Sequence, residues 1–495
     1  MNAETAKRKP TYHVAFDCGN SSFRIMLGTY EDGVMSVEVI DQIPNEAIES
    51  GGLLSWDIEA IFAGLKRGLR VAYERHGRID TVGLATWGID FGLLDESGAL
   101  IANPLCYRNT LGVAALGRLS PEARSFTWEH SGIQNHPMNS LYQLLGIRDR
   151  LPDNLLRARR LLFIPDLILY LFTGEMATER SIASTSQLYD TRAGAYSRDI
   201  LNYYGLSEAL LPPLKRHGEV VGWLKKELQT ELGIGPCPFI CTPSHDTASA
   251  VAALPTLERN QVFISSGTWS LIGIEQPRPL VSAEVERCKF ANEAGVFDTT
   301  TLLKNSTGLY LLQEMKKHFK ATDTPLGWEE IAKVAMERGV DVPVFDPNHP
   351  EIFGTRDMFG TLSRLVGSCD YRTLLASSYL SLALCYRRTM GEIDSLTGER
   401  HSHVYVIGGG CRDRYLCQLT ADVTGMVVHT GPMEAASLGN LVVQRRHLDP
   451  GLDLARLRTI VMDSTGGERE TFTPRTAGGE TLSRKMKEYE ALVCP

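Results

Sequence analysis

A histidine and an aspartate, His245-Asp246, stand side by side directly after a short apolar run. The run, Pro238 to Thr242, is typical of a strand, and the small residues from Thr247 onward predict the start of a helix. A carboxylate held between a strand end and a helix start is well placed to accept a proton from a substrate hydroxyl. The pair is a weak signal alone, so its meaning depends on turns elsewhere in the chain.

Three turns rich in glycine or hydroxyl side chains also follow short apolar strands. The first runs from Asp17 to Arg24, the second from Ser265 to Ser270, and the third is Gly408-Gly409-Gly410. Such turns expose backbone N–H groups with no side chain in the way, and phosphate oxygens bind groups of this kind. Together the three turns predict a nucleotide phosphate tail lying between two halves of the chain.

Other chemistry is suggested by the same residues and fails on spacing. Cys237, Cys241 and His245 suggest a zinc site, but residues four apart on a strand lie about 13 Å apart at about 3.3 Å per residue. That is too far for one ion with bonds of about 2.3 Å.

Ser244, His245 and Asp246 have the residue types of a hydrolase triad. Consecutive residues of an extended chain point to opposite faces, and no G-x-S-x-G turn occurs, which argues against a triad.

The glycines at 408 to 410 also suggest a dinucleotide-binding turn. The G-x-G-x-x-G fingerprint requires a glycine at position 413, where Asp413 stands, and it usually begins a domain near the N-terminus. A dehydrogenase of the Rossmann type is therefore disfavoured.

Several short motifs follow one another in a fixed order along the chain. They are D-x-G-x-S-S-x-R at 17 to 24, T-W-G-I-D-F at 86 to 91, S-G-I-Q at 131 to 134, N-S-L-Y-Q-L at 139 to 144, S-H-D-T-A-S-A-V at 244 to 251, S-S-G-T-W-S-L at 265 to 271, L-K-N at 303 to 305 and G-G-G-C at 408 to 411. In these motifs the chain resembles the FGGY carbohydrate kinases, and within them the rhamnulokinases, over residues 12 to 445.

The resemblance implies ATP-dependent phosphorylation of a ketose, namely a 6-deoxyketohexose such as L-rhamnulose at its 1-hydroxyl. Asp246 is then the expected catalytic base. Asp17 is expected to hold Mg²⁺ through water, since Mg²⁺ keeps several waters and takes only one or two protein carboxylates. Without the resemblance, Asp17 fits a plain Asx turn equally well.

The resemblance also implies which residues bind the substrates. Gly88 and His245 are expected to contact the sugar. Trp87 is a further candidate because it stands beside Gly88, and Trp269 is expected to be structural. The nucleotide site is expected to include Asn20, Ser21, Ser22, Phe23, Arg24, Gly267, Thr268, Asn305, Gln313 and Gly409.

Departures from the family pattern leave two alternatives open. Ala85 and Asn109 stand where rhamnulokinases carry aspartate, so L-fuculose or another ketose is an alternative substrate. Phe23 stands where many relatives have a small residue, which slightly favours a different class of function, a non-catalytic ATP-binding sensor. Turnover with any ketose distinguishes the enzyme from the sensor.

Strand-like and helical runs alternate along the chain, which predicts an α/β fold. Tyr12 to Phe16 and Arg24 to Thr29 predict a hairpin, and Thr81 to Ala85 predicts a strand. Ile58 to Glu74 predicts an amphipathic helix, and Tyr371 to Arg388 predicts a long helix.

The family resemblance implies two actin-like, ribonuclease H-like ATPase domains that face a central cleft. We expect an N-terminal tail at 1–11, a sugar- and phosphate-binding domain at 12–250, a nucleotide-binding domain at 251–470 and a C-terminal tail at 471–495. Within the second domain, residues 404 to 429 predict a strand-helix-strand unit.

Composition excludes several classes of partner. A chain of 495 residues predicts about two to four domains. Its hydrophobic content of 43% and charged content of 22% are typical of a globular protein. The net charge of −8 disfavours a nucleic-acid partner, because binding to a phosphate backbone requires a basic face.

No apolar segment follows Met1, which predicts the absence of a signal peptide. The longest apolar helical stretch, Leu374 to Tyr386, is broken by serines and is too short to span a bilayer. The ten cysteines are irregularly spaced, which predicts reduced, largely buried thiols. We expect a cytoplasmic protein whose partners are a ketose and ATP, either a monomer or a homodimer.

Overall fold

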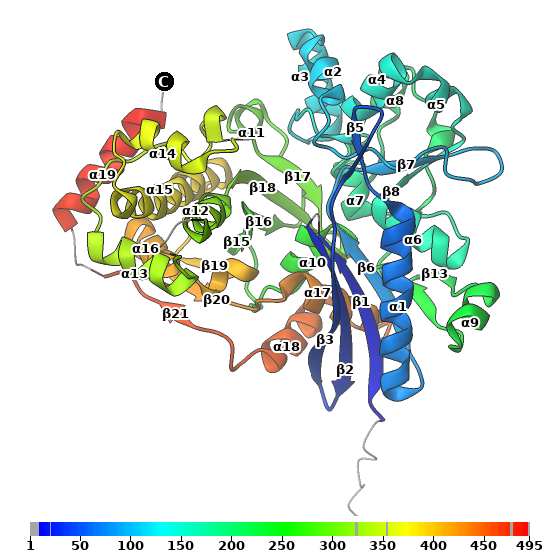
Figure 1. Cartoon of the computed structure of the whole chain (residues 1–495). Coiled ribbons are helices and arrows are strands. Elements are labelled where there is room, and N and C mark those ends of the chain that lie inside the picture. Colours follow the sequence, from blue (N-terminus) through cyan, green and yellow to red (C-terminus); the bar gives the residue numbers. More distant parts are fainter. Residues whose placement is uncertain (1–8, 20, 322–324, 353–354, 476–478, 494–495) are drawn as a thin grey trace, which may run out of the picture. The chain divides into compact units, whose positions relative to one another are not determined.

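The computed structural model describes residues 9–19, 21–321, 325–352, 355–475 and 479–493. The chain forms two compact units (Figure 1). Unit 1 consists of Met1–Leu257, Glu275–Leu302 and Ala435–Ser464, and unit 2 consists of Glu258–Ile274, Leu303–Glu434 and Thr465–Pro495. Two segments that the sequence-based division assigned to the second domain, 275–302 and 435–464, thus pack with the N-terminal residues.

The central sheet of unit 1 has the strand order β13-β14-β6-β1-β2-β3. These strands are β1 (Thr11–Cys18), β2 (Ser22–Glu31), β3 (Val34–Pro44), β6 (Thr81–Thr86), β13 (Val220–Trp223) and β14 (Pro238–Ile240). β1 pairs antiparallel with β2, which confirms the predicted hairpin. β1 also pairs parallel with β6, and β6 pairs parallel with β14. The carboxyl ends of β1, β6 and β14 therefore meet at one edge of the sheet.

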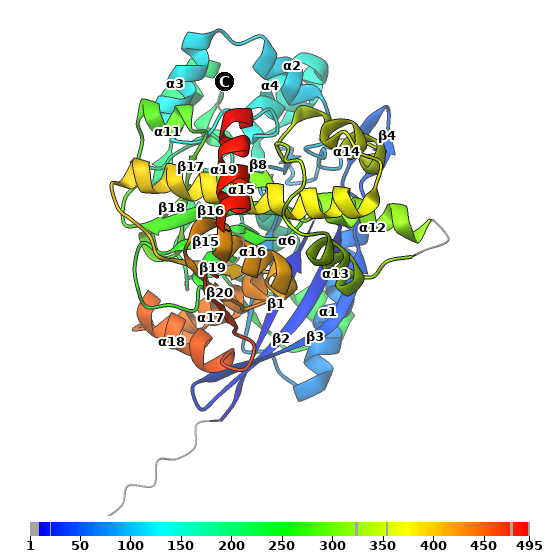
Figure 2. The ribbon, with the colours of Figure 1, turned by 90° about the vertical axis from the view of Figure 1, so that its left-hand side faces the viewer.

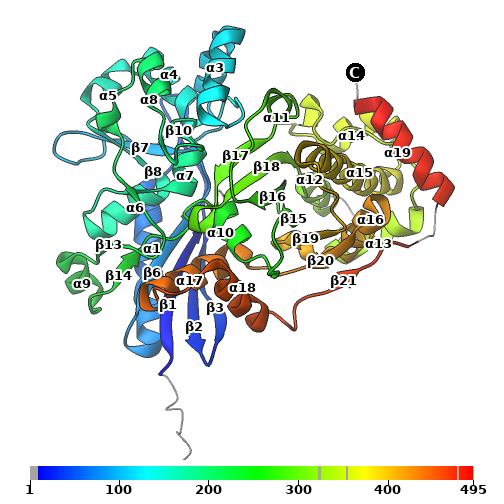
Figure 3. The ribbon, with the colours of Figure 1, turned by 180° about the vertical axis from the view of Figure 1, so that it is seen from behind.

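Helices cover both faces of this sheet. α1 (Ile58–His76) packs against β1, β2 and β3, with Asp57 capping its first turn and Gly77 ending it in the left-handed conformation. This is the amphipathic helix that the sequence predicts. On the other face, α17 (Ala435–Leu448) packs against β1 and β6, and α10 (Asp246–Ala252) packs against α17 (Figure 3). A Cβ atom at Gly439 would lie 1.8 Å from the carbonyl oxygen of Ser249, so this close packing requires glycine.

The other elements of unit 1 are helices and short strands. They are β4 (Ile48–Ser50), β5 (Leu53–Ser55), β7 (Phe91–Leu94), α2 (Leu111–Gly117), α3 (Pro121–Ser131), α4 (Ser140–Arg150), α5 (Pro152–Arg157), β8 (Arg160–Phe163), α6 (Ile164–Thr173), β9 (Thr178–Glu179), α7 (Arg180–Ser184), β10 (Tyr189–Asp190), β11 (Ala195–Tyr196), α8 (Arg198–Tyr204), β12 (Leu214–Lys215), α9 (Lys226–Leu232), α11 (Ala283–Arg287), β17 (Ala291–Ala294) and α18 (Leu454–Ser464).

The second sheet has the strand order β17-β18-β16-β15-β19-β20-β21, and all of these strands except β17 belong at least in part to unit 2. β15 pairs antiparallel with β16 and parallel with β19, and β19 pairs parallel with β20. The elements of this unit are β15 (Val262–Ser266), β16 (Trp269–Gln276), β18 (Thr300–Thr307), α12 (Tyr310–Lys320), α13 (Trp328–Arg338), α14 (Met358–Val366), α15 (Tyr371–Thr397), β19 (His403–Ile407), α16 (Arg414–Thr424), β20 (Val427–Thr430), β21 (Thr471–Phe472) and α19 (Gly479–Val493). β16 and β18 each cross a boundary between the units.

Two predicted features of unit 2 are confirmed. β19, α16 and β20 form the predicted strand-helix-strand unit. The predicted long helix is α15, which packs against α13, α16 and α19 (Figure 2). It continues to Thr397, beyond the predicted end at Arg388.

The segment expected to be a C-terminal tail contains β21 and α19 in its described part. Among the helices that the structure describes, none combines the length and apolarity needed to cross a membrane.

Candidate active site

The His245-Asp246 pair lies at the sheet edge where β1, β6 and β14 end. Beyond Ile240 the chain continues alongside β6, and the N–H of Thr86 donates to the carbonyl oxygen of Ser244 at 2.8 Å. His245 forms a parallel bridge with Thr86, and Asp246 is the first residue of α10. The strand end and helix start that the sequence predicts around Asp246 are therefore present.

His245 lies between two carboxylates. Its Nδ1 atom is 3.0 Å from Oε2 of Glu293, and its Nε2 atom is 3.4 Å from Oδ1 of Asp246. The residue is only 7% exposed. Burial by itself lowers the pKa of His245, but pairing with Glu293 and the charge of Asp246 raise the pKa to about 9. A protonated imidazolium consequently lies beside Asp246 at neutral pH.

Asp246 keeps an accessible carboxylate, since its side chain is 40% exposed. Its Oδ1 atom accepts the N–H of Thr247 at 2.6 Å. Burial raises the pKa of Asp246, the charge of His245 lowers it, and the charge of Asp17 raises it, with a net shift above the ordinary value. A carboxylate with a raised pKa accepts a proton more readily near neutral pH.

Asp17 lies on β1 at the same sheet edge, opposite Arg24 on β2. Nη2 of Arg24 donates to Oδ2 of Asp17 at 2.5 Å, and Oγ of Ser437 donates to the same oxygen at 2.7 Å. Within the described part of the chain, the hydrogen bonds that Asp17 accepts both end on Oδ2. Carboxylate oxygens such as those of Asp17 are ligands that a magnesium ion prefers.

The turn after β1 includes most of the residues expected to hold phosphates, although Asn20 lies outside the described residues. Ser21 is exposed, and the carbonyl oxygen of Ser22 accepts the N–H of Gly19 at 2.9 Å. Phe23 is 2% exposed and belongs to the apolar core of unit 1. Its ring is directed into the core, so Phe23 offers only its backbone to a ligand.

Trp87 and Gly88 follow the end of β6, and the structure gives both of them packing roles. Nε1 of Trp87 donates to Oδ2 of Asp90 at 3.0 Å, and Nε1 of Trp56 donates to the same oxygen at 2.7 Å. Burial raises the pKa of Asp90 to about 6 in spite of these donors. A Cβ atom at Gly88 would lie 3.0 Å from the side chain of Thr185, so a larger residue at 88 would require Thr185 to shift slightly.

In unit 2 the turn between β15 and β16 lies beside the start of α12. Oγ1 of Thr268 donates to Oε1 of Gln313 at 3.2 Å, and the N–H of Leu309 donates to the carbonyl oxygen of Gly267 at 2.9 Å. Thr268 is exposed, as is Asn305 on β18. The structure thus brings Gly267, Thr268 and Gln313, three of the expected nucleotide residues, into one cluster.

The three glycines after β19 differ in their backbone conformation and in the space around them. Gly408 has a φ of +80°, in the left-handed region, and a Cβ atom at Gly410 would lie 2.0 Å from Oγ of Ser266. A Cβ atom at Gly409 would meet nothing within 4 Å, and Gly409 is exposed. Neither backbone geometry nor packing explains a glycine at 409, whereas an approaching ligand would.

Sequence reasoning missed three acidic residues near these candidates, namely the buried Glu179 and Asp90 and the partly buried Glu293. Each binds residues that are distant in the sequence: Glu179 binds Ser244, Glu293 pairs with His245, and Asp90 accepts from Trp56. The residues next to each carboxylate in the sequence do not reveal its partner, because that partner lies far away along the chain.

In comparison with known proteins, both halves of the chain match the same protein family. Residues 12–253 match the N-terminal domain, and residues 262–447 the C-terminal domain, of the FGGY family of carbohydrate kinases. A rhamnulokinase from Bacteroides thetaiotaomicron is 35% identical over 460 residues, which cover 91% of this chain and 93% of that protein. A rhamnulokinase from Enterobacter sp. is 33% identical over 473 residues, which cover 94% of each.

Solved structures share the fold at low identity. A xylulose kinase from Lactobacillus acidophilus superimposes with a TM-score of 0.79 at 14% identity and covers 97% of both chains. A glycerol kinase from Plasmodium falciparum, solved with ADP, has a TM-score of 0.78 at 13% identity over 98% of this chain and 97% of that chain. These likenesses show the predicted fold, two sheet-containing domains of the actin-like ATPase type.

Proposed function

The chain belongs to the FGGY family of carbohydrate kinases and is a sugar kinase, and from this premise we propose that it phosphorylates a ketose with ATP. The first candidate is L-rhamnulose, with L-rhamnulose 1-phosphate and ADP as products. The observation that supports this assignment best is the similarity to rhamnulokinases over more than nine tenths of the chain.

In the proposed reaction Asp246 accepts the proton of the 1-hydroxyl as the oxygen attacks the γ-phosphorus of ATP. The bond between that phosphorus and the bridging oxygen of ADP breaks, and the proton remains on Asp246 until product release. Three features support this role: the position of Asp246 at the start of α10, its accessible carboxylate and its raised pKa. We propose that His245 contacts the sugar from beside the base.

The phosphates are proposed to lie along the turn from Asn20 to Arg24 and along the turn of Gly267 and Thr268. Asp17 would hold Mg²⁺ through water, and the ion would neutralise charge on the phosphates. Arg24, which forms an ion pair with Asp17, adds a positive charge to this turn. Asn305, Gln313 and Gly409 are proposed to line the nucleotide site, and the open backbone at Gly409 supports this placement.

L-Fuculose remains the alternative substrate because of Ala85 and Asn109. The structure assigns Asn109 a scaffold role: its Nδ2 atom donates to the carbonyl oxygens of Leu54 and Cys106 at 2.7 and 2.8 Å. Its Oδ1 atom accepts the N–H of Leu54 at 2.9 Å. Since this side chain is committed to the backbone, its effect on sugar preference would be indirect.

The sensor alternative loses its main support, because the ring of Phe23 is buried in the core of unit 1 and does not fill the turn. Trp87 stays a candidate sugar contact through its ring, although its N–H is bound to Asp90. We propose a cytoplasmic location, where ATP is available for this reaction.

A coupled ADP-release assay with L-rhamnulose, L-fuculose, L-ribulose and D-xylulose tests the proposal. We expect the highest kcat/KM with L-rhamnulose. A higher value with L-fuculose would support the alternative substrate, and the absence of ketose-dependent ADP release would support the sensor.

A further inference from the structure

Glu179 is a buried carboxylate at the end of β9, and it caps the helix that follows. It is 4% exposed. It accepts the N–H groups of Ser181 and Ile182 at 2.7 and 3.3 Å, and the hydroxyl of Ser181 also donates to it. These contacts alone would make Glu179 an ordinary N-cap of α7.

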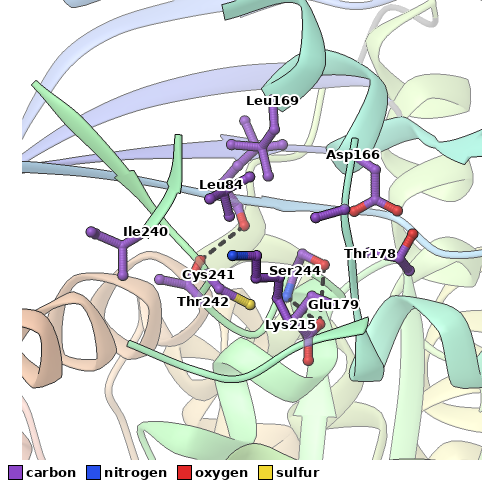
Figure 4. Close-up of a pocket in the computed structure, with 12 residues that line it drawn as sticks. Leu84, Asp166, Leu169, Thr178, Glu179, Lys215, Ile240, Cys241, Thr242 and Ser244 are labelled. Atoms are coloured by element: carbon purple, nitrogen blue, oxygen red, sulfur yellow. Dashed lines mark hydrogen bonds between the residues drawn. The ribbon is translucent and has the colours of Figure 1, made fainter. Parts of the chain in front are cut away.

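Donors from two distant segments also converge on Glu179. Nε2 of His217 lies 2.7 Å from Oε1, and the N–H and Oγ of Ser244 donate to Oε2 at 2.9 and 3.0 Å. Figure 4 shows Glu179 and Ser244 side by side. A carboxylate has about four lone-pair sites, and those of Glu179 are shared between donors of α7 and donors from His217 and Ser244. A residue that only capped the helix would need no donors from outside it. Burial by itself raises the pKa of Glu179, but its hydrogen bonds, above all the one from His217, lower the pKa to about 2.

The residues held by Glu179 lead directly to the proposed base. Ser244 and His245 precede Asp246, and both donors of Ser244 end on Glu179. The N–H of His245 donates at 3.1 Å to Oγ of Ser181, the hydroxyl that itself donates to Glu179. The backbone leading into Asp246 is therefore anchored, directly or through one hydroxyl, to a single carboxylate.

His217 fixes the carboxylate from the other side. Its Nδ1 atom accepts the N–H of Phe297 at 3.2 Å, so the proton on Nε2 is the one directed at Glu179. Glu179 thus joins three segments of unit 1 that are far apart in the sequence.

We propose that Glu179 is a positioning residue for phosphoryl transfer, which acts through Ser244 and His245 to hold Asp246 in place. The proposal rests on the proposed function, in which Asp246 is the base. A displacement of a catalytic group by about 1 Å is sufficient to reduce turnover by about 100-fold. Loss of Glu179 should therefore affect kcat more than substrate binding.

The test compares Glu179→Gln, Asp246→Asn and the double variant, with the ketose that is turned over best. An amide in place of the carboxylate directs an N–H group at neighbouring donors. We expect Glu179→Gln to lower kcat by about 10- to 100-fold and to leave the KM for ATP within about twofold, because the hydrogen bonds of Glu179 in the described part of the chain all end on residues of unit 1. The double variant should be no slower than Asp246→Asn alone, since residues that act as a unit give non-additive losses.

A matched control is Asp57→Asn, which removes a capping carboxylate that bonds only the first turn of α1. It should keep the wild-type kcat. If Glu179→Gln fails to fold, Ser244→Ala removes one donor to the same carboxylate and should show the same non-additivity with Asp246→Asn.

The outcomes separate the two proposals. Multiplied losses in the double variant, or a wild-type kcat in folded Glu179→Gln, would overturn the positioning role and leave Asp246 as the base. A wild-type kcat in Asp246→Asn would overturn the base assignment and the positioning role with it.

Discussion

His245 and its two acidic neighbours set the charge around the proposed base. The imidazolium is stabilised by Glu293 at 3.0 Å and by Asp246 at 3.4 Å. This places a positive charge next to a carboxylate whose pKa burial has raised. Burial raises the pKa of Asp246 and the charge of His245 lowers it, and the net upward shift favours Asp246 as a proton acceptor.

Asp246→Asn should remove most phosphoryl transfer, because the amide keeps the shape of the side chain but cannot accept the proton. A general base contributes about 10²–10⁴-fold to the rate, so kcat should fall by at least about 100-fold, with the KM for ATP nearly unchanged. Steady-state kinetics with matched folding checks decide this. Retention of more than about a third of the wild-type kcat would be incompatible with the base role.

Glu293→Gln should change how stability depends on pH. The pKa of His245 is about 9 in the folded chain, compared with about 6.5 for an unperturbed histidine. The stabilisation from this shift is therefore fully present below about pH 6.5. It is lost as the pH rises through about 9, and it amounts to about 3 kcal/mol at ~1.36 kcal/mol per pKa unit.

Thermal unfolding between pH 6 and pH 9.5 measures this effect. The wild-type protein should lose stability across that range, and Glu293→Gln should lose clearly less. Identical pH dependence in the two proteins would show that Glu293 does not hold His245 in its charged form.

At the scale of elements, tight turns at the ends of parallel strands place the candidate residues. In unit 2, β15 and β19 are parallel neighbours, so the turn at Gly267 lies beside the turn at Gly408. A Cβ atom at Gly267 would meet only the carbonyl oxygen of Trp269, at 3.8 Å, and its φ is outside the left-handed region. The fold therefore tolerates a side chain there, and a substitution at 267 reports on ligand binding.

Gly267→Val should consequently fold normally and raise the KM for ATP several-fold, because a β-branched side chain would crowd backbone that the phosphates approach. The control is Gly467→Val, at another open glycine of unit 2 where a Cβ atom meets nothing within 4 Å. Kinetics with varied ATP provide the measurement. An unchanged KM for ATP in folded Gly267→Val would remove this turn from the nucleotide site.

At the scale of the whole molecule, segments late in the chain complete both units. Residues 435–464 add α17 and α18 to unit 1, and residues 465–495 add β21 and α19 to unit 2. Tyr489 on α19 is 2% exposed, and this helix packs against α15. The C-terminal region that the sequence suggests is a tail thus contributes to a folded core.

Tyr489→Ala should lower the free energy of unfolding by about 3 kcal/mol, the usual cost of deleting a buried aromatic ring. Lys487→Ala, at an exposed position of the same helix, should change it by less than about 0.5 kcal/mol. Chemical denaturation of the two variants makes the comparison. Equal stabilities would mean that α19 does not contribute to the core.

The sequence alone determined the features that depend on short segments. The β1–β2 hairpin, helix α1, the β19-α16-β20 unit and the placement of Asp246 between a strand end and a helix start all follow from local hydrophobic periodicity and turn residues. The ordered motifs also identified the family, because each motif is contiguous.

Only the tertiary structure decided which distant residues meet. Glu179 with Ser244, Glu293 with His245, and Ser437 with Asp17 are pairs separated by tens to hundreds of residues. The same holds for the direction of Phe23 into the core and for the return of residues 435–464 to unit 1. A buried polar group must find a partner wherever folding brings one near, and that partner leaves no periodic signal in its own segment.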